Sequence, residues 1–428
     1  MVLADQLRTA SGVPFAQARF LVTAGDTPLG FATVELDEGR LDRDLVFAAI
    51  AEQLGPSIEA YIASCGASGS DRLDLAHQPL PRQADVLPPL SIAVVVATRD
   101  RPEQLRRCLA SLRALEYEFL EVVVVDNGSR DDATERAFAE TVGGDRRFRL
   151  VAEPRQGLSR AQNRGLQEVR ADFVAFTDDD VRVDDRWING IRRGFARRAD
   201  VACVTGLVVS ATLESAAERY FDARVWWSAH FEPRIFEAQP GPGDAGGHPY
   251  TAGLFGTGAN MSFRVEVLRA LGGFDEALGT GSPSAGGSDL DAFVRILLSG
   301  HALAYEPSAL VWHEHRASEE DLERQLYTYG KGLASYLTKF VLSPRTGPAV
   351  LIRVPRGIWH AVRLGRRSAA ARSQSGIGSG VSRAELRGFL AGPAAYLRAR
   401  RDQDPENRRL VRPSQVSVPS SSVARPYR

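Results

Sequence analysis

The sequence predicts an α/β protein whose central domain is built on a mostly parallel sheet. Between residues 90 and 342, short runs of apolar and β-branched residues alternate with segments of helical periodicity, which is typical of βαβ units. A small α/β unit is expected before this domain, at 1–65, followed by a linker rich in Gly, Ser, Asp and Pro at 66–89. A basic and helical region, ending in a disordered tail, is expected at 343–428.

Composition narrows the class of protein further. A chain of 428 residues is long enough for two or three domains, and its formal net charge of zero argues against a whole-chain nucleic-acid binder. The cysteines Cys65, Cys108 and Cys203 form no CxxC pair, which argues against a disulfide framework or structural zinc and favours a reducing cytoplasm. We find neither a signal-peptide pattern nor an apolar run of about 18 residues, so no spanning helix is predicted.

The N-terminal unit is predicted to be a hairpin followed by a helix. Strands are predicted at 18–23 and 29–36, with a turn at Gly25-Asp26 between them. Apolar residues then recur at helical spacing over 41–63. No residue pattern in this unit points to chemistry, so we interpret it as a packing or partner-binding module.

The central domain is predicted from its alternating pattern. Strands are expected at 92–97, 122–125, 148–152 and 173–177, helices at 133–141 and 158–169, and a further apolar segment at 302–312. Asp100 and Glu103 have the spacing of a capping box, so Asp100 is expected to cap the helix that follows the first strand. In parallel sheets ligands bind at the carboxyl ends of the strands, and the polar residues there are the candidates for a site.

The first two strand ends carry hydrogen-bonding side chains. The first strand ends at Thr98-Arg99-Asp100 and the second at Asp126-Asn127-Gly128-Ser129. Together they offer hydrogen bonds suited to a nucleobase and a ribose. Ordinary turn chemistry explains the same residues, because Asp, Asn, Gly and Ser are favoured in turns.

The third segment opens a helix with basic residues in its first turns. Arg160, Asn163 and Arg164 follow the turn at Gly157. Helix N-termini and arginines suit anionic phosphates. The segment lacks the GxGxxG pattern of a dinucleotide site, which argues against a dehydrogenase. A capped amphipathic helix without a ligand is the alternative.

The fourth strand runs directly into three acidic residues, Asp178, Asp179 and Asp180. Adjacent carboxylates repel one another, and a bound cation would relieve the repulsion. Oxygen ligands of this kind suit Mg²⁺ or Mn²⁺, which would also bind the oxygens of a diphosphate. A solvated acidic turn is the alternative, which the position after a buried strand disfavours.

Two further groups of polar residues lie downstream. Asp289 and Asp291 open a predicted helix after two glycines; Asp289 is a candidate general base, and Asp291 fits a structural role in the first helical turn. His313 ends the apolar segment 302–312, next to Glu314 and His315. Imidazole is a common metal ligand, and a structural histidine is the alternative.

In their shared order, these motifs resemble the family 2 glycosyltransferases. The resemblance covers roughly residues 90–340 and rests on the Asp178–Asp180 cluster, the pair Asp289 and Asp291 followed by Arg295, and Val311-Trp312-His313. The segments Gly256–Arg264 and Leu271–Glu276 lie between them as in the family pattern. The resemblance implies the GT-A fold, which is Rossmann-like, and an inverting transfer of a sugar from a nucleoside-diphosphate sugar to a hydroxyl acceptor.

The resemblance also implies roles for individual residues. Asp178, Asp180 and His313 match the metal-binding positions, and Asp289 matches the catalytic base. The positions expected to hold the donor or meet the acceptor are Thr98, Arg99, Asp126, Arg160, Asn163, Asp179, Gly258 and Asn260. The implied cofactor is Mn²⁺ or Mg²⁺. The chain departs from the family at Ser288, where a Glu is usual, and at Gln162, where many relatives have Arg.

The C-terminal region raises the question of a membrane. From Ser343 to Arg428 there are 17 arginines, no lysine and 4 acidic residues, a net charge of +13. Apolar residues at helical spacing lie among the arginines over 383–401, with a kink or break expected at Gly392-Pro393. Such segments favour peripheral contact with an anionic membrane, or else pack on the catalytic domain with solvated arginines.

The acceptor suggested by membrane contact is a glycan or a lipid-linked molecule, and the expected location is the cytoplasm, at the inner face of the plasma membrane. Two other functions are weighed against glycosyl transfer. One is nucleotidyl transfer, whose Gly/Arg/Lys-rich signature is not found at the start of the sheet. The other is a non-catalytic module that binds a nucleotide sugar, which the presence of Asp178, Asp180 and Asp289 disfavours.

Overall fold

The structure is a computed structural model that describes residues 7–8, 12–65, 87–225, 228–241, 247–251, 253–353, 355, 372–373 and 375–412. The chain divides into two compact units, one formed by Met1–Leu87 with Ala229–Glu232 and the other by Pro88–Ser228 with Pro233–Arg428. Most of the predicted linker, at 66–86, and the end of the predicted disordered tail, at 413–428, lie outside the described residues.

The first unit is the predicted hairpin with one helix. Strands β1 (Gln17–Ala24) and β2 (Thr27–Glu35) pair antiparallel, and helix α1 (Arg43–Ser64) packs on β2. The Asp42 side chain caps α1 by accepting a hydrogen bond from the Asp44 backbone N–H at 2.8 Å. One apolar cluster of this unit is formed by the buried residues Ala24, Leu29, Ala32, Leu54, Ile58 and Tyr61.

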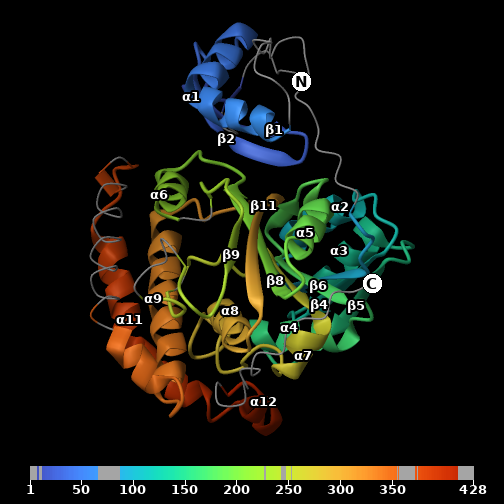
Figure 1. The fold of residues 1–428 in the computed structure, drawn as a ribbon, viewed down its shortest axis with the longest axis vertical. Helices are drawn as coiled ribbons and strands as arrows, with labels where there is room; N and C mark the ends of the chain where they lie inside the picture. The colour runs from blue at the N-terminus through green and yellow to red at the C-terminus, as the bar shows by residue number, and fades with distance from the viewer. Residues whose placement is uncertain are drawn as a thin grey trace. The chain divides into compact units, whose positions relative to one another are not determined.

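A mixed sheet forms the centre of the second unit (Figure 1). One half of it is parallel, in the order β5 (Phe148–Ala152), β4 (Leu120–Asp126), β3 (Ile92–Thr98), β6 (Phe173–Asp178). These are the four strands predicted from their apolar runs. The helices that connect them are α2 (Pro102–Arg113), α3 (Ala133–Val142) and α4 (Leu158–Glu168).

Alternate residues of these strands face opposite sides of the sheet. Val95 and Val125 belong to the same apolar cluster as Ala161 of α4, whereas Val94 belongs to a second cluster with Leu105 of α2. Because helices cover both faces, β3, β4 and β6 are buried along most of their length and consist mainly of Val, Ala, Ile and Phe, whereas β5 at the end of the sheet is only partly buried. The expected α/β architecture is therefore confirmed.

The other half of the sheet contains antiparallel pairings. Its strands are β7 (Val181–Val183), β8 (Val201–Ser210), β9 (Arg234–Phe236), β10 (Met261–Arg264) and β11 (Ala302–His313). β10 lies antiparallel between β6 and β8, and β11 runs parallel to β8 while pairing antiparallel with β7 and β9. The helices of this half are α5 (Trp187–Ala196), α6 (Ala216–Arg224), α7 (Val265–Ala270) and α8 (Ser288–Leu298).

The C-terminal part of the second unit includes helices α9 (Glu319–Val341), α11 (Gly380–Ala399) and α12 (Pro405–Leu410). α9 and α11 lie side by side (Figure 1). They approach closely because glycines face the contact: a Cβ added at Gly388 would lie 2.0 Å from the Tyr327 carbonyl oxygen. Of the kink or break expected at Gly392-Pro393, the break is wrong, since α11 runs through both residues, and the kink stays a prediction. Within the described ranges, none of the helices combines the length and apolar character needed to cross a bilayer.

Candidate functional site

The acidic triplet and His313 come together because of one short strand pairing. β6 ends at Asp178, and the chain turns through Asp179 and Asp180 into β7, which pairs with the end of β11 so that Val181 lies opposite His313. The Asp180 carbonyl accepts a hydrogen bond from the Glu314 backbone N–H at 3.0 Å. As a result His313 Nε2 lies 3.1 Å from Asp180 Oδ1.

Asp178, Asp180 and His313 form a candidate metal-binding cluster. One ligand atom from each lies within 4.8 Å of the other two, and all three side chains are only partly buried. Two carboxylates and one imidazole are a donor set that suits Mn²⁺ and also accommodates Mg²⁺. Because these three side chains are partly exposed, an anionic ligand could supply the remaining ligands of a bound metal ion.

The electrostatics of this cluster favour a cation. Burial, followed by the negative charge of Asp180, raises the pKa of Asp178 to about 7. Burial opposes ionisation of Asp180 as well, but the charge and hydrogen bond of His313 lower its pKa below the usual range. Burial would lower the pKa of His313, and Asp180 outweighs it and raises that pKa. A divalent ion would replace the protons that this cluster otherwise retains.

Asp179 points to a different set of partners. It accepts a hydrogen bond from Thr98 Oγ1 at 2.8 Å and from Arg101 NH1 at 3.0 Å. The same Arg101 nitrogen lies 2.9 Å from Asp180 Oδ2. Arg101 therefore compensates two of the three clustered charges. Arg101 was not predicted from the sequence, because its segment was interpreted as a helix cap. The signal that could have found it is an arginine just after β3, the strand next to the one that leads into the three acidic residues.

The predicted cap at Asp100 is wrong. The helix is preceded by Arg101 without a side-chain cap, and Asp100 has a positive φ of 56°. The Asp100 carboxylate instead accepts hydrogen bonds from the Arg130 backbone N–H at 2.9 Å and from Arg130 Nε at 3.0 Å. These contacts join the ends of β3 and β4, the two strand ends expected to hold a nucleoside.

Asp289 is held beside the acidic cluster by the segment before β10. Asp289 Oδ2 accepts a hydrogen bond from the Gly258 backbone N–H at 3.0 Å, and the neighbouring Ala259 carbonyl accepts one from Thr177 Oγ1 at 2.9 Å. Thr177 directly precedes Asp178. Burial raises the pKa of Asp289, while backbone hydrogen bonds oppose the shift. Its charge also contributes to the raised pKa of Asp178, so the two carboxylates are within electrostatic range.

Thr98, Arg99 and Asp126 lie together at the sheet edge. Thr98 is opposite Asp126 in the pairing of β3 with β4, and Ala97 is opposite Asp178 in the pairing with β6. Asp126 Oδ1 accepts hydrogen bonds from the Ser129 backbone N–H at 3.0 Å and from Ser129 Oγ at 2.6 Å. Arg99 is partly exposed, with Nε 3.6 Å from Asp100 Oδ2.

Arg160 and Asn163 are engaged elsewhere. Arg160 contacts Glu276 at 3.3 Å and the Asp402 carbonyl at 2.9 Å. Asn163 Nδ2 donates to the Phe274 carbonyl at 2.9 Å and Asn163 Oδ1 accepts from the Phe274 N–H at 2.7 Å. At the start of α4, the N–H of Leu158 is bonded to the Thr280 carbonyl at 2.8 Å. The side chains of Arg160 and Asn163 are thus bonded to other parts of the protein, and the role expected of them at the diphosphate stays a prediction.

Gly258 and Asn260, two further residues expected at the ligand, differ in their contacts. Gly258 contacts the candidate base directly, as described above. Asn260 is buried, accepts a hydrogen bond from Trp187 Nε1 at 2.9 Å and donates to the Ala309 carbonyl at 2.7 Å. Its amide thus connects α5 to β11, and the ligand role expected of Asn260 stays a prediction.

A row of rings leads away from the metal-binding cluster. The rings of His313 and His315 lie 4.8 Å apart, those of His315 and Phe221 4.6 Å, and those of Phe221 and Tyr329 6.0 Å. Tyr329 of α9 is 40% exposed. The row was not foreseen from the sequence, because it joins α6, the end of β11 and α9, which are far apart along the chain.

Comparison with known proteins finds a family match for the part of the chain that contains the acidic triplet. The family model described as Glycosyl transferase family 2 matches residues 93–271. The pre-mycofactocin glycosyltransferase of Mycobacterium tuberculosis is 29% identical over 262 residues, which is 61% of this chain and 50% of that protein. The succinoglycan biosynthesis protein ExoM of Rhizobium meliloti is 29% identical over 252 residues, 56% of this chain and 74% of that protein.

The chain therefore spans about half the length of the mycobacterial relative. Among solved structures, mannosyltransferase PcManGT from Pyrobaculum calidifontis, in complex with GDP-Man and Mn²⁺, is similar with a TM-score of 0.47 and 17% sequence identity. That similarity covers 83% of this chain and 96% of the other.

Proposed function

Residues 93–271 of this chain belong to glycosyl transferase family 2, and on that premise we propose a metal-dependent, inverting transfer of a sugar from a nucleoside-diphosphate sugar to a hydroxyl acceptor. The observation that carries the proposal is the convergence of Asp178, Asp180 and His313 beside Asp289. One cluster can hold a cation, and the neighbouring carboxylate can accept a proton. Mn²⁺ or Mg²⁺ bound by the cluster would neutralise the charge of the leaving diphosphate.

The protein's own residues have separate tasks in this reaction. Asp289 takes the proton from the acceptor hydroxyl as that oxygen attacks the anomeric carbon of the donor. The bond from this carbon to the diphosphate oxygen breaks on the opposite side, so the configuration inverts. The Gly258 N–H fixes the orientation of Asp289, and Arg101 limits the repulsion between Asp179 and Asp180 before the donor arrives.

The donor's nucleoside is proposed to lie along the ends of β3 and β4. Thr98, Arg99, Asp126 and Asp179 supply hydrogen-bonding groups there, at the carboxyl edge of parallel strands where ligands bind in such sheets. This position would place the diphosphate against Asp178 and Asp180. The base and the metal-binding cluster would then flank the bond that breaks.

The acceptor is proposed to approach past Tyr329. Thr328 and Gly332, on either side of it in α9, approach Gly286 and Gly287, the residues that lead into the helix of Asp289. A partly exposed aromatic ring next to a base is suited to the apolar face of a sugar. A glycan or a lipid-linked sugar is the proposed acceptor, and the name of the rhizobial relative, a succinoglycan biosynthesis protein, supports the glycan.

The experiment measures which product leaves a nucleotide sugar. The purified protein is incubated with UDP-, GDP- and dTDP-sugars, each with and without Mn²⁺ or Mg²⁺, and released nucleoside diphosphate is quantified. We expect slow release from one nucleotide class, only with metal, and a loss of roughly 100-fold or more in Asp180→Asn. Glu118→Gln, which changes an exposed carboxylate far from the cluster in sequence, should match the wild type.

Two outcomes would favour the rival functions. Release of pyrophosphate would identify a nucleotidyltransferase. A metal-dependent rise in melting temperature with a nucleotide sugar, without any product, would identify a non-catalytic binding module. Equal release with and without metal would contradict the role given to Asp178, Asp180 and His313.

The proposed location is the cytoplasm, at the inner face of the plasma membrane. A lipid-linked acceptor has its sugar at a membrane surface, so a transferase acting on it needs peripheral contact with that surface. The basic C-terminal region, with 17 arginines and 4 acidic residues between Ser343 and Arg428, is the part of the chain suited to such contact.

A further inference from the structure

Helix α11 has two contrasting faces. One face is buried in the second unit and consists of small and apolar residues, among them Val381, Ala384, Gly388, Gly392 and Ala395. The opposite face exposes four large apolar side chains: Leu386 is 60% exposed, Phe389 41%, Leu390 72% and Leu397 50%. Their spacing along the helix keeps them on one side of it. Soluble proteins rarely expose so many large apolar side chains on one element unless something binds there.

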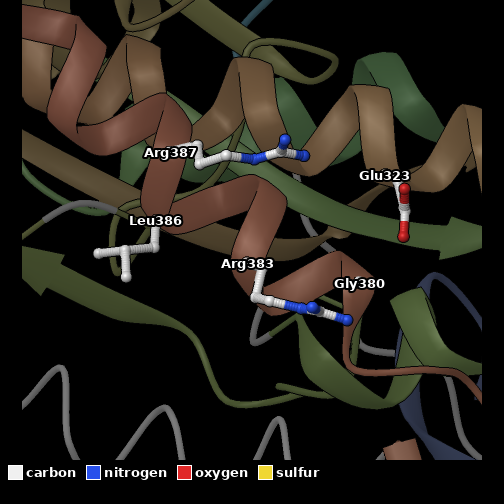
Figure 2. Close-up of a pocket in the computed structure, with 5 residues that line it drawn as sticks. All are labelled: Glu323, Gly380, Arg383, Leu386 and Arg387. Atoms are coloured by element: carbon white, nitrogen blue, oxygen red, sulfur yellow. The ribbon is translucent and has the colours of Figure 1, made fainter.

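Arginines lie among these apolar side chains. Arg383, Arg387 and Arg398 are exposed on the same side of α11. Figure 2 shows Arg383, Leu386 and Arg387 projecting from α11, and these three side chains line a pocket together with Glu323 of α9. Among the described residues none of the three arginines forms an ion pair. The single acid of α11, Glu385, is bound to Arg224, so it does not neutralise this face.

The combination of charges and apolar side chains identifies the occupant. Leucines and a phenylalanine can enter the boundary between headgroups and acyl chains, while arginines extend alongside them to lipid phosphates. A nucleic acid would leave the four apolar side chains without a partner. We propose that the face formed by Arg383, Leu386, Arg387, Phe389, Leu390, Leu397 and Arg398 binds an anionic membrane surface, with α11 lying in its plane.

This inference names the surface for the membrane contact proposed above. It does not depend on the transfer reaction, because binding can be measured without donor or metal. The buried face of α11 holds the helix in the second unit, so the helix is already formed before it meets a membrane. A preformed helix has no folding cost on binding, unlike a disordered basic segment.

The test is flotation of the full chain with vesicles of phosphatidylcholine alone or mixed with phosphatidylglycerol. The wild type should float with the mixed vesicles and stay behind with phosphatidylcholine alone. Leu386→Ser combined with Leu390→Ser should weaken binding roughly tenfold or more. Arg383→Gln and Arg387→Gln should each weaken it about fivefold, and less at high salt. Leu45→Ser, at a residue 55% exposed in the first unit, is the matched control.

The variants change exposed side chains, and equal circular dichroism and melting temperature would verify that each has folded. Three outcomes would overturn the proposal: no flotation of the wild type, equal flotation with both vesicle types, or full binding by the double serine variant. A change in sedimentation between the wild type and the double variant without vesicles would mean instead that this face binds a second copy of the chain.

Discussion

At the scale of single residues, Asp289 combines a proposed chemical role with a cost to stability. Its pKa is raised by burial, so the folded protein binds its proton more tightly than the unfolded chain does. Below the pKa of about 3.9 that this carboxyl has in the unfolded chain, Asp289 does not weaken the fold. As the pH rises through the higher pKa of the folded state, the free energy of unfolding decreases. Ionisation of Asp289 therefore occurs at the expense of the fold.

Asp289→Asn should thus separate activity from stability. We expect transfer and donor breakdown to fall about 100-fold or more, because the base is lost, while the melting temperature at pH 7 stays equal or rises. The difference in melting temperature should vanish near pH 4. In the wild type, activity should fall as the pH drops through the raised pKa. The measurements are rate and thermal melting against pH.

Asp291→Asn in the same helix is the matched control for this prediction. Asp291 is fully buried and lies 2.8 Å from Arg295 and 2.5 Å from Lys339, so its loss should lower the melting temperature. If Asp289→Asn proved as destabilising as Asp291→Asn, the loss of activity would reflect damage to the fold, and the role of base would fall.

How far single residues could be foreseen depended on whether their partners lie nearby in sequence. Asp178–Asp180 was visible because three acids follow a buried strand, and the structure brings His313 to them as the motif order suggested. The hydrogen bonds of Asn163 and Asn260 could not be predicted, because their partners, Phe274, Trp187 and Ala309, are supplied by distant segments. No local pattern distinguishes an amide that binds a ligand from one that bonds to the backbone.

At the scale of elements, a buried ionic network joins α8 to α9. Lys339 Nζ lies 2.5 Å from Asp291 and 2.8 Å from Asp275, and Arg295 pairs with Asp291 and donates to the Leu271 carbonyl at 2.7 Å. All four side chains are 4% exposed or less. The network fixes the helix that carries Asp289 without including that residue.

Lys339→Met should therefore destabilise the second unit strongly. The substitution keeps much of the apolar volume but leaves Asp275 without its cation, and breaking a buried pair in this way costs about 3–5 kcal/mol. Denaturant unfolding would measure the loss. Arg324→Met, which removes a 72% exposed arginine from α9, should cost at most about 1 kcal/mol. A Lys339→Met chain as stable as the wild type would mean that the network contributes little to holding α8.

A strand or helix could be predicted from the sequence where its own residues form a clear pattern of apolar positions. The four parallel strands were found because buried strands are near-continuous apolar runs, as Val122–Val125 illustrates. β7, which contains only Val181, Arg182 and Val183, could not be found in that way, because it exists as a strand through its pairing with β11. Yet this short pairing is what brings His313 to Asp180.

At the scale of the whole molecule, the candidate site belongs to one unit. Every residue given a role in the proposed reaction lies in Pro88–Ser228 or Pro233–Arg428, and so do the largest apolar clusters. The apolar cluster of the first unit is made only from residues between Val22 and Cys65. Among the residues that the structure describes, the candidate site and the two largest clusters include none of the first 87.

The two ends of the chain should therefore respond differently to truncation. A chain that begins at Pro88 should keep the melting temperature of the second unit and its metal-dependent release of nucleoside diphosphate. A chain that ends at Arg401 should melt earlier, because Gln403 donates to Asp275 at 2.7 Å, and Asn407 donates to the Phe274 carbonyl at 2.9 Å and accepts from the Glu276 N–H at 3.1 Å.

Each of these lost hydrogen bonds should cost about 1 kcal/mol, and more where it leaves a buried polar group unpaired. Because Asp275 also binds Lys339, the effect should reach α8, and product release should fall together with stability. Calorimetry and the product assay, applied to both truncated chains, provide the comparison. If the chain beginning at Pro88 lost metal-dependent release while its melting temperature was unchanged, the first unit would have a direct part in the reaction.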